Sequence, residues 1–136
     1  MPVERFKASR WTRGNHLFPT IIEVTETAVV DGRPVLVFNC LEQDLALDRR
    51  GLPGGVWVVA TDGPLGPYDV TAAQLLADRT YYVGRLVPER LTGRTLFLAF
   101  RHDGPDGSFV GGICDPRPVG WRGDRLVLLD EVPAPA

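Results

Sequence analysis

The chain has 136 residues, of which 44% are apolar and 24% charged, and its formal net charge is −2. This length suits one domain, and the composition excludes a disordered tail, a coiled coil and a collagen-like chain. The mildly acidic balance argues against a general nucleic-acid-binding protein and leaves a neutral ligand open. The chain contains 15 Gly and 12 Pro, which indicates many short elements joined by turns.

No segment of the sequence is apolar over enough residues to span a membrane. The longest apolar runs, 56–60 and 96–100, are far shorter than the roughly 18 residues that a spanning helix needs. The basic N-terminus is followed by no apolar core, so we expect no secretory signal and a cytoplasmic protein. In that compartment, Cys40 and Cys114 are expected to be buried, reduced thiols.

The first half of the chain has the pattern of strands. Residues 20–30 are β-branched almost throughout and are followed by Asp31-Gly32, a pair that tolerates the positive φ angles of a tight turn. This pattern predicts a hairpin between 20–30 and 34–38. Another strand is expected at 55–61, and residues 70–78 have the spacing of a short helix.

The second half of the chain continues this pattern and defines the fold class. Strands are expected at 81–87, 95–101, 108–114, 118–121 and 126–129. Short strands with almost no helix indicate an all-β fold. Residues 80–130 have the length of one four-stranded antiparallel propeller blade, and 34–76 supply most of another. We therefore predict a partial β-propeller of two to three blades.

Several stretches between residues 31 and 129 resemble a known family. They are Asp31-Gly-Arg-Pro-Val-Leu-Val-Phe38, Gly55-Val-Trp-Val-Val59 with Gly63-Pro-Leu-Gly-Pro-Tyr68, Tyr82-Val-Gly-Arg-Leu-Val87, Leu96-Phe-Leu-Ala-Phe100 and Pro105-Asp-Gly-Ser-Phe-Val-Gly-Gly-Ile-Cys-Asp-Pro116. Together they resemble the later blades of the five-bladed β-propeller glycoside hydrolases of families 32, 43 and 68, which are furanosidase-type enzymes. The resemblance implies an ancestor that acted on furanosides, fructosides or arabinosides.

The N-terminal part has a different resemblance. Residues 11–30 are similar to the opening hairpin of a bacterial pleckstrin-homology-like domain. Such a barrel normally ends in a helix, which Pro133 and Pro135 would break at the C-terminus of this chain. We therefore expect one domain over 1–136, with an N-terminal hairpin of open origin at 1–30 and a propeller-blade-like region at 31–136.

The resemblance does not supply a catalytic pair. Glycoside hydrolysis needs two carboxyl groups across the scissile bond. In the family that the chain resembles, one Asp comes from the first blade, which this chain lacks. The acid Glu lies just ahead of the strand that matches 34–38, where this sequence has His16-Leu-Phe-Pro-Thr20. No catalytic residue is therefore identified, and we expect weak or no hydrolysis.

Tyr82 and Arg85 are the candidate substrate-binding residues, because they lie on the stretch that resembles an innermost blade strand. The alternatives are core packing for Tyr82, with its hydroxyl at the rim, and an inter-blade salt bridge for Arg85. Glu42 and Asp44 could form a carboxylate pair, although a solvated loop is favoured.

Three tryptophans and two short motifs have structural interpretations. Trp57 is expected in the core, and Trp11 and Trp121 are expected to pack rather than stack on a sugar. Arg122-Gly123-Asp124 matches an integrin-type tripeptide, but it lies where a hairpin turn is needed. Gly111-Gly112 is interpreted as a bulge or as close packing between blades.

The sequence predicts no metal site and no cofactor. His102, Asp103 and Asp106 form an acidic loop that lacks the pattern of a calcium-binding loop. Neither His16 nor His102 has a Cys or Ser partner in a catalytic triad, and zinc spacing and phosphate-binding Gly motifs are absent.

Two functions remain in competition. The first is a glycoside-hydrolase-like propeller segment that is related to furanosidases and fructosidases and is incomplete for catalysis. The alternative is a non-enzymatic β module that binds carbohydrate or protein. Carbohydrate is the expected partner, with no nucleic acid and no membrane. Unpaired strand edges in an incomplete propeller also predict a homo-oligomer.

Overall fold

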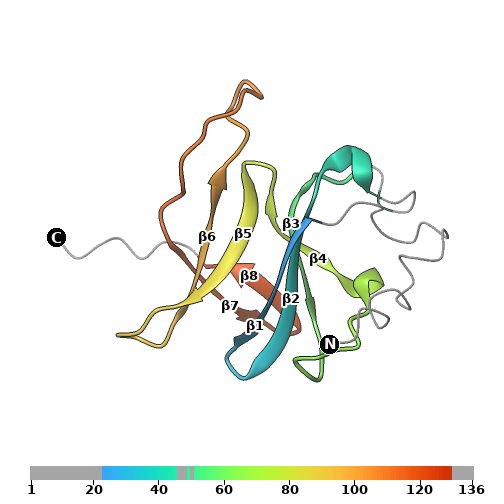
Figure 1. Ribbon diagram of the computed structural model, residues 1–136, viewed down its shortest axis with the longest axis vertical. Helices are drawn as coiled ribbons and strands as arrows, with labels where there is room; N and C mark the ends of the chain where they lie inside the picture. Colours follow the sequence, from blue (N-terminus) through green and yellow to red (C-terminus); the bar gives the residue numbers. More distant parts are fainter. Residues whose placement is uncertain (1–22, 46–48, 50, 130–136) are drawn as a thin grey trace.

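The computed structural model describes residues 23–45, 49 and 51–129, and this part of the chain is all-β (Figure 1). It forms two four-stranded antiparallel sheets, in each of which the strands follow their sequence order. The first sheet contains β1 (Glu23–Val30), β2 (Arg33–Cys40), β3 (Gly55–Ala60) and β4 (Gln74–Asp78). The second contains β5 (Tyr81–Pro88), β6 (Thr95–Arg101), β7 (Arg117–Arg122) and β8 (Arg125–Leu128). The predicted class, meandering sheets of a partial propeller, is confirmed.

The hairpin expected at Asp31-Gly32 is present. Asp31 and Gly32 have φ angles of 49° and 77°, and Val30 pairs with Arg33 across the turn. Two positive φ angles give the turn a twist that matches the twist of the flanking strands. Residues 23–30 are thus hydrogen-bonded to β2 as the first strand of the first sheet. Trp11, His16 and the rest of 1–22 lie outside the described residues.

The two central strands of the first sheet are buried on both faces. Val35 and Val37 on β2 pack with Val56 and Val58 on β3 in a core that also contains residues of the second sheet. Successive side chains of a strand point to opposite faces, so the residues between them form a second core on the other side. That core consists of Leu36, Phe38, Cys40, Leu45, Trp57, Val59, Tyr68, Val70 and Ala73. The core position predicted for Trp57 is confirmed.

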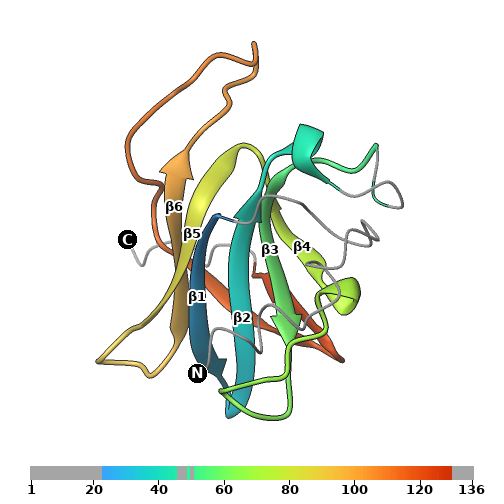
Figure 2. The same ribbon diagram turned by 45° about the vertical axis from the view of Figure 1, so that its right-hand side comes forward.

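The second sheet packs across the first, and strands at both of its edges, β5 and β8, contact the first sheet. β5 contacts β2 and β3, and β8 contacts β4. The β7–β8 hairpin passes behind the first sheet in the view of Figure 2 and reaches the β1–β2 turn. There the indole Nε1 of Trp121 donates a hydrogen bond to the Val30 carbonyl at 2.9 Å, and the Arg33 guanidinium lies 3.8 Å from the Trp121 ring centroid. Trp121 therefore packs, as expected.

The helix expected at 70–78 is wrong. A single 3-10 turn, η4 (Val70–Ala72), begins at Asp69, whose carboxylate accepts from the Thr71 amide, and residues 74–78 form strand β4. A window of two turns gains little as an isolated helix. Pairing with β3 satisfies the same backbone groups and buries Leu76 and Ala77.

The strand expected at 108–114 is also wrong. The ribbon over 102–114 has only isolated bridges, Phe100 with Ile113 and Asp103 with Phe109. Gly111 and Gly112 have φ angles of 81° and 77°, which an extended strand cannot contain. Close packing between blades does not explain this glycine pair. A Cβ at Gly111 would meet only the ring of Phe109 in the same ribbon, at 3.3 Å, and a Cβ at Gly112 would meet nothing within 4 Å. The third strand of the sheet is β7 instead.

Two further predictions are confirmed in the described part of the chain, the turn at 122–124 and the burial of the two cysteines. The tripeptide 122–124 forms the β7–β8 turn, where Arg122 pairs with Arg125 and Gly123 has a φ of 63°. Cys40 and Cys114 are buried free thiols. No helix among the described residues has the length and apolar character needed to cross a membrane.

Candidate functional site

Four loops and strand starts meet at one end of the two sheets, which is the upper end in Figure 1. We call this region the loop end. It consists of Glu23 at the start of β1, the 3-10 turn η2 (Glu42–Asp44) after β2, the β4–β5 turn at 79–80, and the ribbon 102–110 after β6. Loops held by a rigid sheet are common positions for binding residues.

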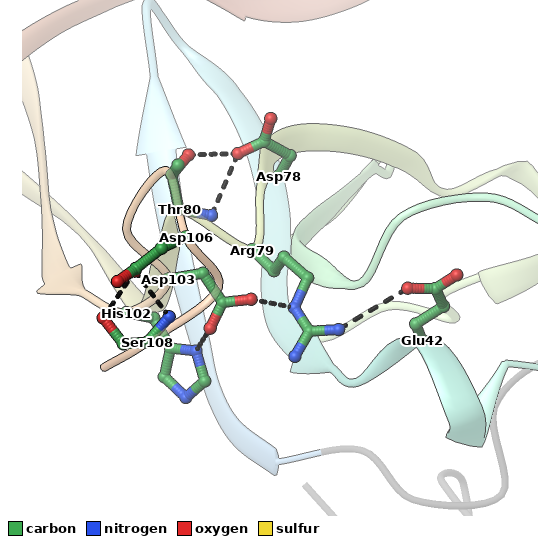
Figure 3. A network of polar contacts seen from close by, with 8 residues as sticks. All are labelled: Glu42, Asp78, Arg79, Thr80, His102, Asp103, Asp106 and Ser108. Carbon is green, nitrogen blue, oxygen red and sulfur yellow. Dashed lines mark hydrogen bonds and ion pairs between the residues drawn. The ribbon is translucent and has the colours of Figure 1, made fainter. Parts of the chain in front are cut away.

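Arg79 is the centre of an ionic network at the loop end. Figure 3 shows its guanidinium between two carboxylates from different sheets. Nε forms an ion pair with Asp103, and Nη1 lies 3.5 Å from Oε2 of Glu42. The other oxygen of Asp103 lies 2.8 Å from Nδ1 of His102. Glu42 therefore faces Arg79 across the joint between the sheets.

Short hydrogen bonds fix the two loops that carry this network. The amides of His102 and Asp103 donate to the carbonyls of Thr80 and Arg79 at 2.8 and 3.1 Å. Within the ribbon, the carboxylate of Asp106 accepts from the amide and hydroxyl of Ser108, and these bonds lower its pKa (Figure 3). The loop end is thus built from mutually bonded backbone segments.

Tyr82 lies at the loop end, at the start of β5. Its side chain is buried, and its hydroxyl donates to Oε2 of Glu23 at 2.8 Å. Its ring centroid lies 5.3 Å from that of His102. Burial raises the pKa of Tyr82 above its ordinary value, and the hydrogen bond to Glu23 raises it further. These contacts agree with the alternative given for Tyr82 from the sequence, in which the ring packs in the core and the hydroxyl lies at its rim.

Two bulges bring Tyr82 and Arg85 onto the same face of their strand. β5 inserts one extra residue between its pairs Tyr82–Phe100 and Arg85–Leu98, so residues three apart are aligned. β1 has the matching irregularity between Glu23 and Glu26. Nη1 of Arg85 lies 3.4 Å from Oε2 of Glu26. Each predicted substrate-binding residue therefore contacts a glutamate of the neighbouring sheet.

A buried asparagine joins the two bulges. The amide nitrogen of Asn39 donates to the carbonyls of Glu23 and Val24 at 3.2 and 3.1 Å, and its oxygen accepts from the amide of Gly84 at 3.0 Å. Val24 and Val83 have φ angles of 47° and 56°, which valine rarely adopts, so the bulges need such support. Asn39 is not among the predicted site residues, although an amide inside the apolar run 35–40 is a signal that the sequence contains.

Gly84 lets the strands approach each other at this point. A Cβ at Gly84 would lie 2.6 Å from Cγ1 of Val56 and 2.8 Å from Cε2 of Phe97. Neither contact is possible without movement of the core. The glycine thus permits the close packing that brings β5 onto the first sheet.

Cys40 lies next to this site, but its thiol is not reactive. Burial raises its pKa to about 12, and the carboxylates of Asp44 and Glu23 add to the effect. A thiol with this pKa is protonated near neutral pH and is not a nucleophile. Within the described residues, no group of three or more His, Cys, Asp or Glu side chains is arranged to hold a metal ion.

Comparison with known proteins supports the fold alone. No family model matches the sequence, and no curated protein sequence matches it. The fold is similar to solved structures of levansucrase, with a TM-score of 0.57 over 84% of this chain. The identity is 13% to a Bacillus subtilis levansucrase that contains oligosaccharides and to a levansucrase that contains sucrose, and 14% to another Bacillus subtilis structure.

The class that this fold defines is a partial β-propeller, because the levansucrase structures that it resembles are five-bladed propellers. The chain spans 28% of the length of the levansucrase chains that it matches. Its fold is therefore similar to part of a levansucrase propeller, which agrees with the propeller fold that the resemblance over 31–129 implies.

Proposed function

We propose that this chain binds a furanoside, such as a fructoside or arabinoside, at the loop end and does not hydrolyse it unaided. The observation that carries the proposal is the pairing of Tyr82 with Glu23 and of Arg85 with Glu26 where two blade-like sheets meet. These are the two residues that the family resemblance implies for substrate binding. The fold match to a sugar-bound levansucrase supports the same class of ligand.

The loop end has the chemistry that a sugar requires. Carboxylates accept hydrogen bonds from hydroxyls, and guanidinium groups donate to them in a fixed geometry. Glu23 places such a group on the Tyr82 hydroxyl. Arg79 and Glu42 belong to the ionic network that reaches the Tyr82 ring through Asp103 and His102. Phe109 adds an exposed aromatic ring, whose centroid lies 5.7 Å from that of His102. An exposed ring beside polar groups can hold the apolar face of a sugar.

The absence of unaided hydrolysis is argued from the sequence. The stretch at 16–20 has no Glu where the family that the chain resembles carries its acid. Binding and catalysis are therefore separate parts of the proposal, and each needs its own measurement.

The binding test is an amide-resolved NMR titration of the full chain with sucrose, fructo-oligosaccharides and arabino-oligosaccharides. We expect shifts confined to 23–26, 79–85 and 102–110. Glu23→Gln preserves an acceptor for Tyr82, and it should weaken binding roughly tenfold through loss of a charged acceptor. Asp124→Asn, at the opposite end, is the matched control. A titration that moves no amide at the loop end would contradict the proposal.

The catalytic test uses the same protein with sucrose and an aryl arabinofuranoside. We expect no release of product above the rate without protein. Protein-dependent turnover that Glu23→Gln abolishes would overturn the second half of the proposal and make Glu23 a catalytic candidate.

A further inference from the structure

Two adjacent hollows lie at the end of the molecule opposite the loop end. We call this region the turn end, because it contains the β1–β2 turn, the β7–β8 turn and the start of the β3–β4 connection at 61–62. One hollow, of about 260 Å³, is lined by β3, η4 and β4 of the first sheet and by the β7–β8 hairpin of the second. The other, of about 390 Å³, is lined by the β1–β2 turn and by 60–62. Ala60 and Asp124 line both hollows, which therefore share a border.

The hollow that both sheets line has largely apolar walls. Val58 and Leu126 are buried, and the half-buried indole of Trp121 contributes a ring. Gln74 and Asp124 add an amide and a carboxylate. Apolar walls with a few convergent polar groups are typical of a small-molecule site. Because an apolar cavity of about 150 Å³ can hold benzene, a hollow of about 260 Å³ has room for one six-membered ring.

The polar groups that the turn end leaves free are mainly hydrogen-bond acceptors. The Asp62 carboxylate has no hydrogen-bond or ion-pair partner among the described residues. Arg33 contacts Oδ1 of Asp124, and the structure gives Oδ2 no partner in the described part of the chain. The Thr61 hydroxyl donates to the Pro67 carbonyl and keeps its lone pairs as acceptors. Such a set of acceptors favours a ligand that is positively charged and rich in donors.

The donors at the turn end are largely engaged within the chain. Nε1 of Trp121 donates to the Val30 carbonyl, and Arg33 donates to the Gly123 carbonyl and to Asp124. The Arg33 guanidinium also lies 3.8 Å from the Trp121 ring centroid. One indole and one carboxylate thus already hold a planar cation here, which is the chemistry that a ligand would repeat. With one guanidinium against two carboxylates, the lining keeps an uncompensated negative charge.

We propose that the turn end binds a small aromatic cation, of the arylamidinium or arylammonium class. Its ring occupies the hollow beside Trp121 and Leu126. Its cationic group lies at the shared border of the two hollows, where it donates to Oδ2 of Asp124 and to Asp62. This site uses none of the residues of the loop end, so the inference is independent of sugar binding there.

The test is an amide-resolved NMR titration of the full chain with benzamidine at low ionic strength. Benzamide has the same shape without the charge, and benzoate has the opposite charge, so the two serve as matched probes. We expect benzamidine to shift the Trp121 indole signal and the amides of 58–62, 72–74 and 124–126. It should bind at least about tenfold more tightly than benzamide, because only the cation forms charge-assisted hydrogen bonds with the carboxylates. Benzoate should not bind, and added salt should weaken the binding of benzamidine.

Two substitutions locate the charge that the ligand recognises. Asp62→Asn and Asp124→Asn should each weaken benzamidine binding by about fivefold or more, because each removes a charged acceptor. Both side chains are exposed, so circular dichroism should show unchanged folding. Asp115→Asn is the matched control, since Asp115 is exposed and lines neither hollow.

Three results would overturn the proposal. The first is a titration in which benzamidine moves no turn-end signal or binds no more tightly than benzamide. The second is equal binding of benzamidine to the unmodified protein and to both Asp variants. The third is a set of shifts at the loop end as large as those at the turn end, which would show that benzamidine follows negative charge in general.

Discussion

The two sheets have the same number of strands and the same connectivity, yet they bury their residues differently. In the first sheet, β2 and β3 separate two cores, and their side chains are apolar on both faces. In the second, β5 and β6 bury one face and expose the other. Sheets with equal strand patterns can therefore have distinct roles, with the first supplying stability and the second supplying surface.

The largest expected effect compares the two sheets directly. Trp57→Ala removes a fully buried ring from the first sheet and should lower the free energy of unfolding by about 3–5 kcal/mol. Phe100→Ala, on β6 of the second sheet, should cost less than about 1 kcal/mol, because this side chain is 45% exposed. Urea unfolding followed by circular dichroism measures both. Equal losses would mean that Phe100 stabilises the fold as much as the buried Trp57 does.

The next effect concerns the joint between the sheets. Asn39→Leu leaves the Gly84 amide and two β1 carbonyls without their partner and should cost about 2–3 kcal/mol. Hydrogen exchange at the Gly84 amide should accelerate in the variant. Gln43→Leu, an exposed substitution in η2, is the control for the change in side-chain type. An unchanged exchange rate at the Gly84 amide would show that Asn39 does not hold the two bulges together.

Alkaline pH should weaken the same joint by a smaller amount. The folded state holds the pKa of Cys40 at about 12, against about 9 for a free thiol, so the unfolded chain loses this proton first. Stability is therefore complete below pH 9 and falls as the pH rises from 9 toward 12. The loss from Cys40 is about 1 kcal/mol at pH 10. The raised pKa of Tyr82 acts in the same direction.

Two variants separate these contributions. Cys40→Ala should flatten the decline of unfolding free energy that begins near pH 9. Tyr82→Phe should flatten the part that begins near pH 10, where a free tyrosine ionises. Parallel curves for both variants and the unmodified protein would show that other groups control the alkaline decline.

The smallest effect lies at the far end from the loops. Arg33 and Asp124 form an exposed ion pair at 3.2 Å between the two hairpin turns. Asp124→Asn should change the free energy of unfolding by less than about 0.5 kcal/mol, and added salt should remove even that difference. The Trp121 indole bond to Val30 holds the turns together independently of this pair. A loss above about 1 kcal/mol would make the ion pair structural.

The sequence correctly predicts those strands in which the pattern of apolar residues matches the burial of each position. The run at 34–38 is apolar at every position after Pro34 because both faces of β2 are buried, and Asp31-Gly32 suits only a tight turn. The helix predicted at 70–78 is wrong because the spacing of its apolar residues reflects only local preference. In the fold, residues 74–78 pair with the edge of β3 instead. The strand at 108–114 is wrong because the positive φ of two glycines outweighs the apolar pattern around them.

The candidate site is less accessible to sequence analysis than the fold. Tyr82 and Arg85 follow from the family resemblance, but their glutamate partners lie on a strand 59 residues earlier in the chain. No local pattern contains such a pairing. The bulges that align these residues shift the alternation of the strand by one position, which a strict two-residue period cannot represent. Arg79 and Phe109 depend likewise on how loops meet in space.

Asn39 also bears on how this fold avoids alternative packings. Two apolar sheet surfaces can pack in several alignments of similar free energy, because apolar contacts are not directional. The amide of Asn39 accepts only one alignment, in which the Gly84 amide and the two β1 carbonyls arrive together. A shifted alignment of the sheets would leave these polar groups buried without hydrogen-bond partners. One side chain thus selects a unique register from a family of nearly equivalent ones, and it does so at the point where the predicted ligand-binding residues must be aligned.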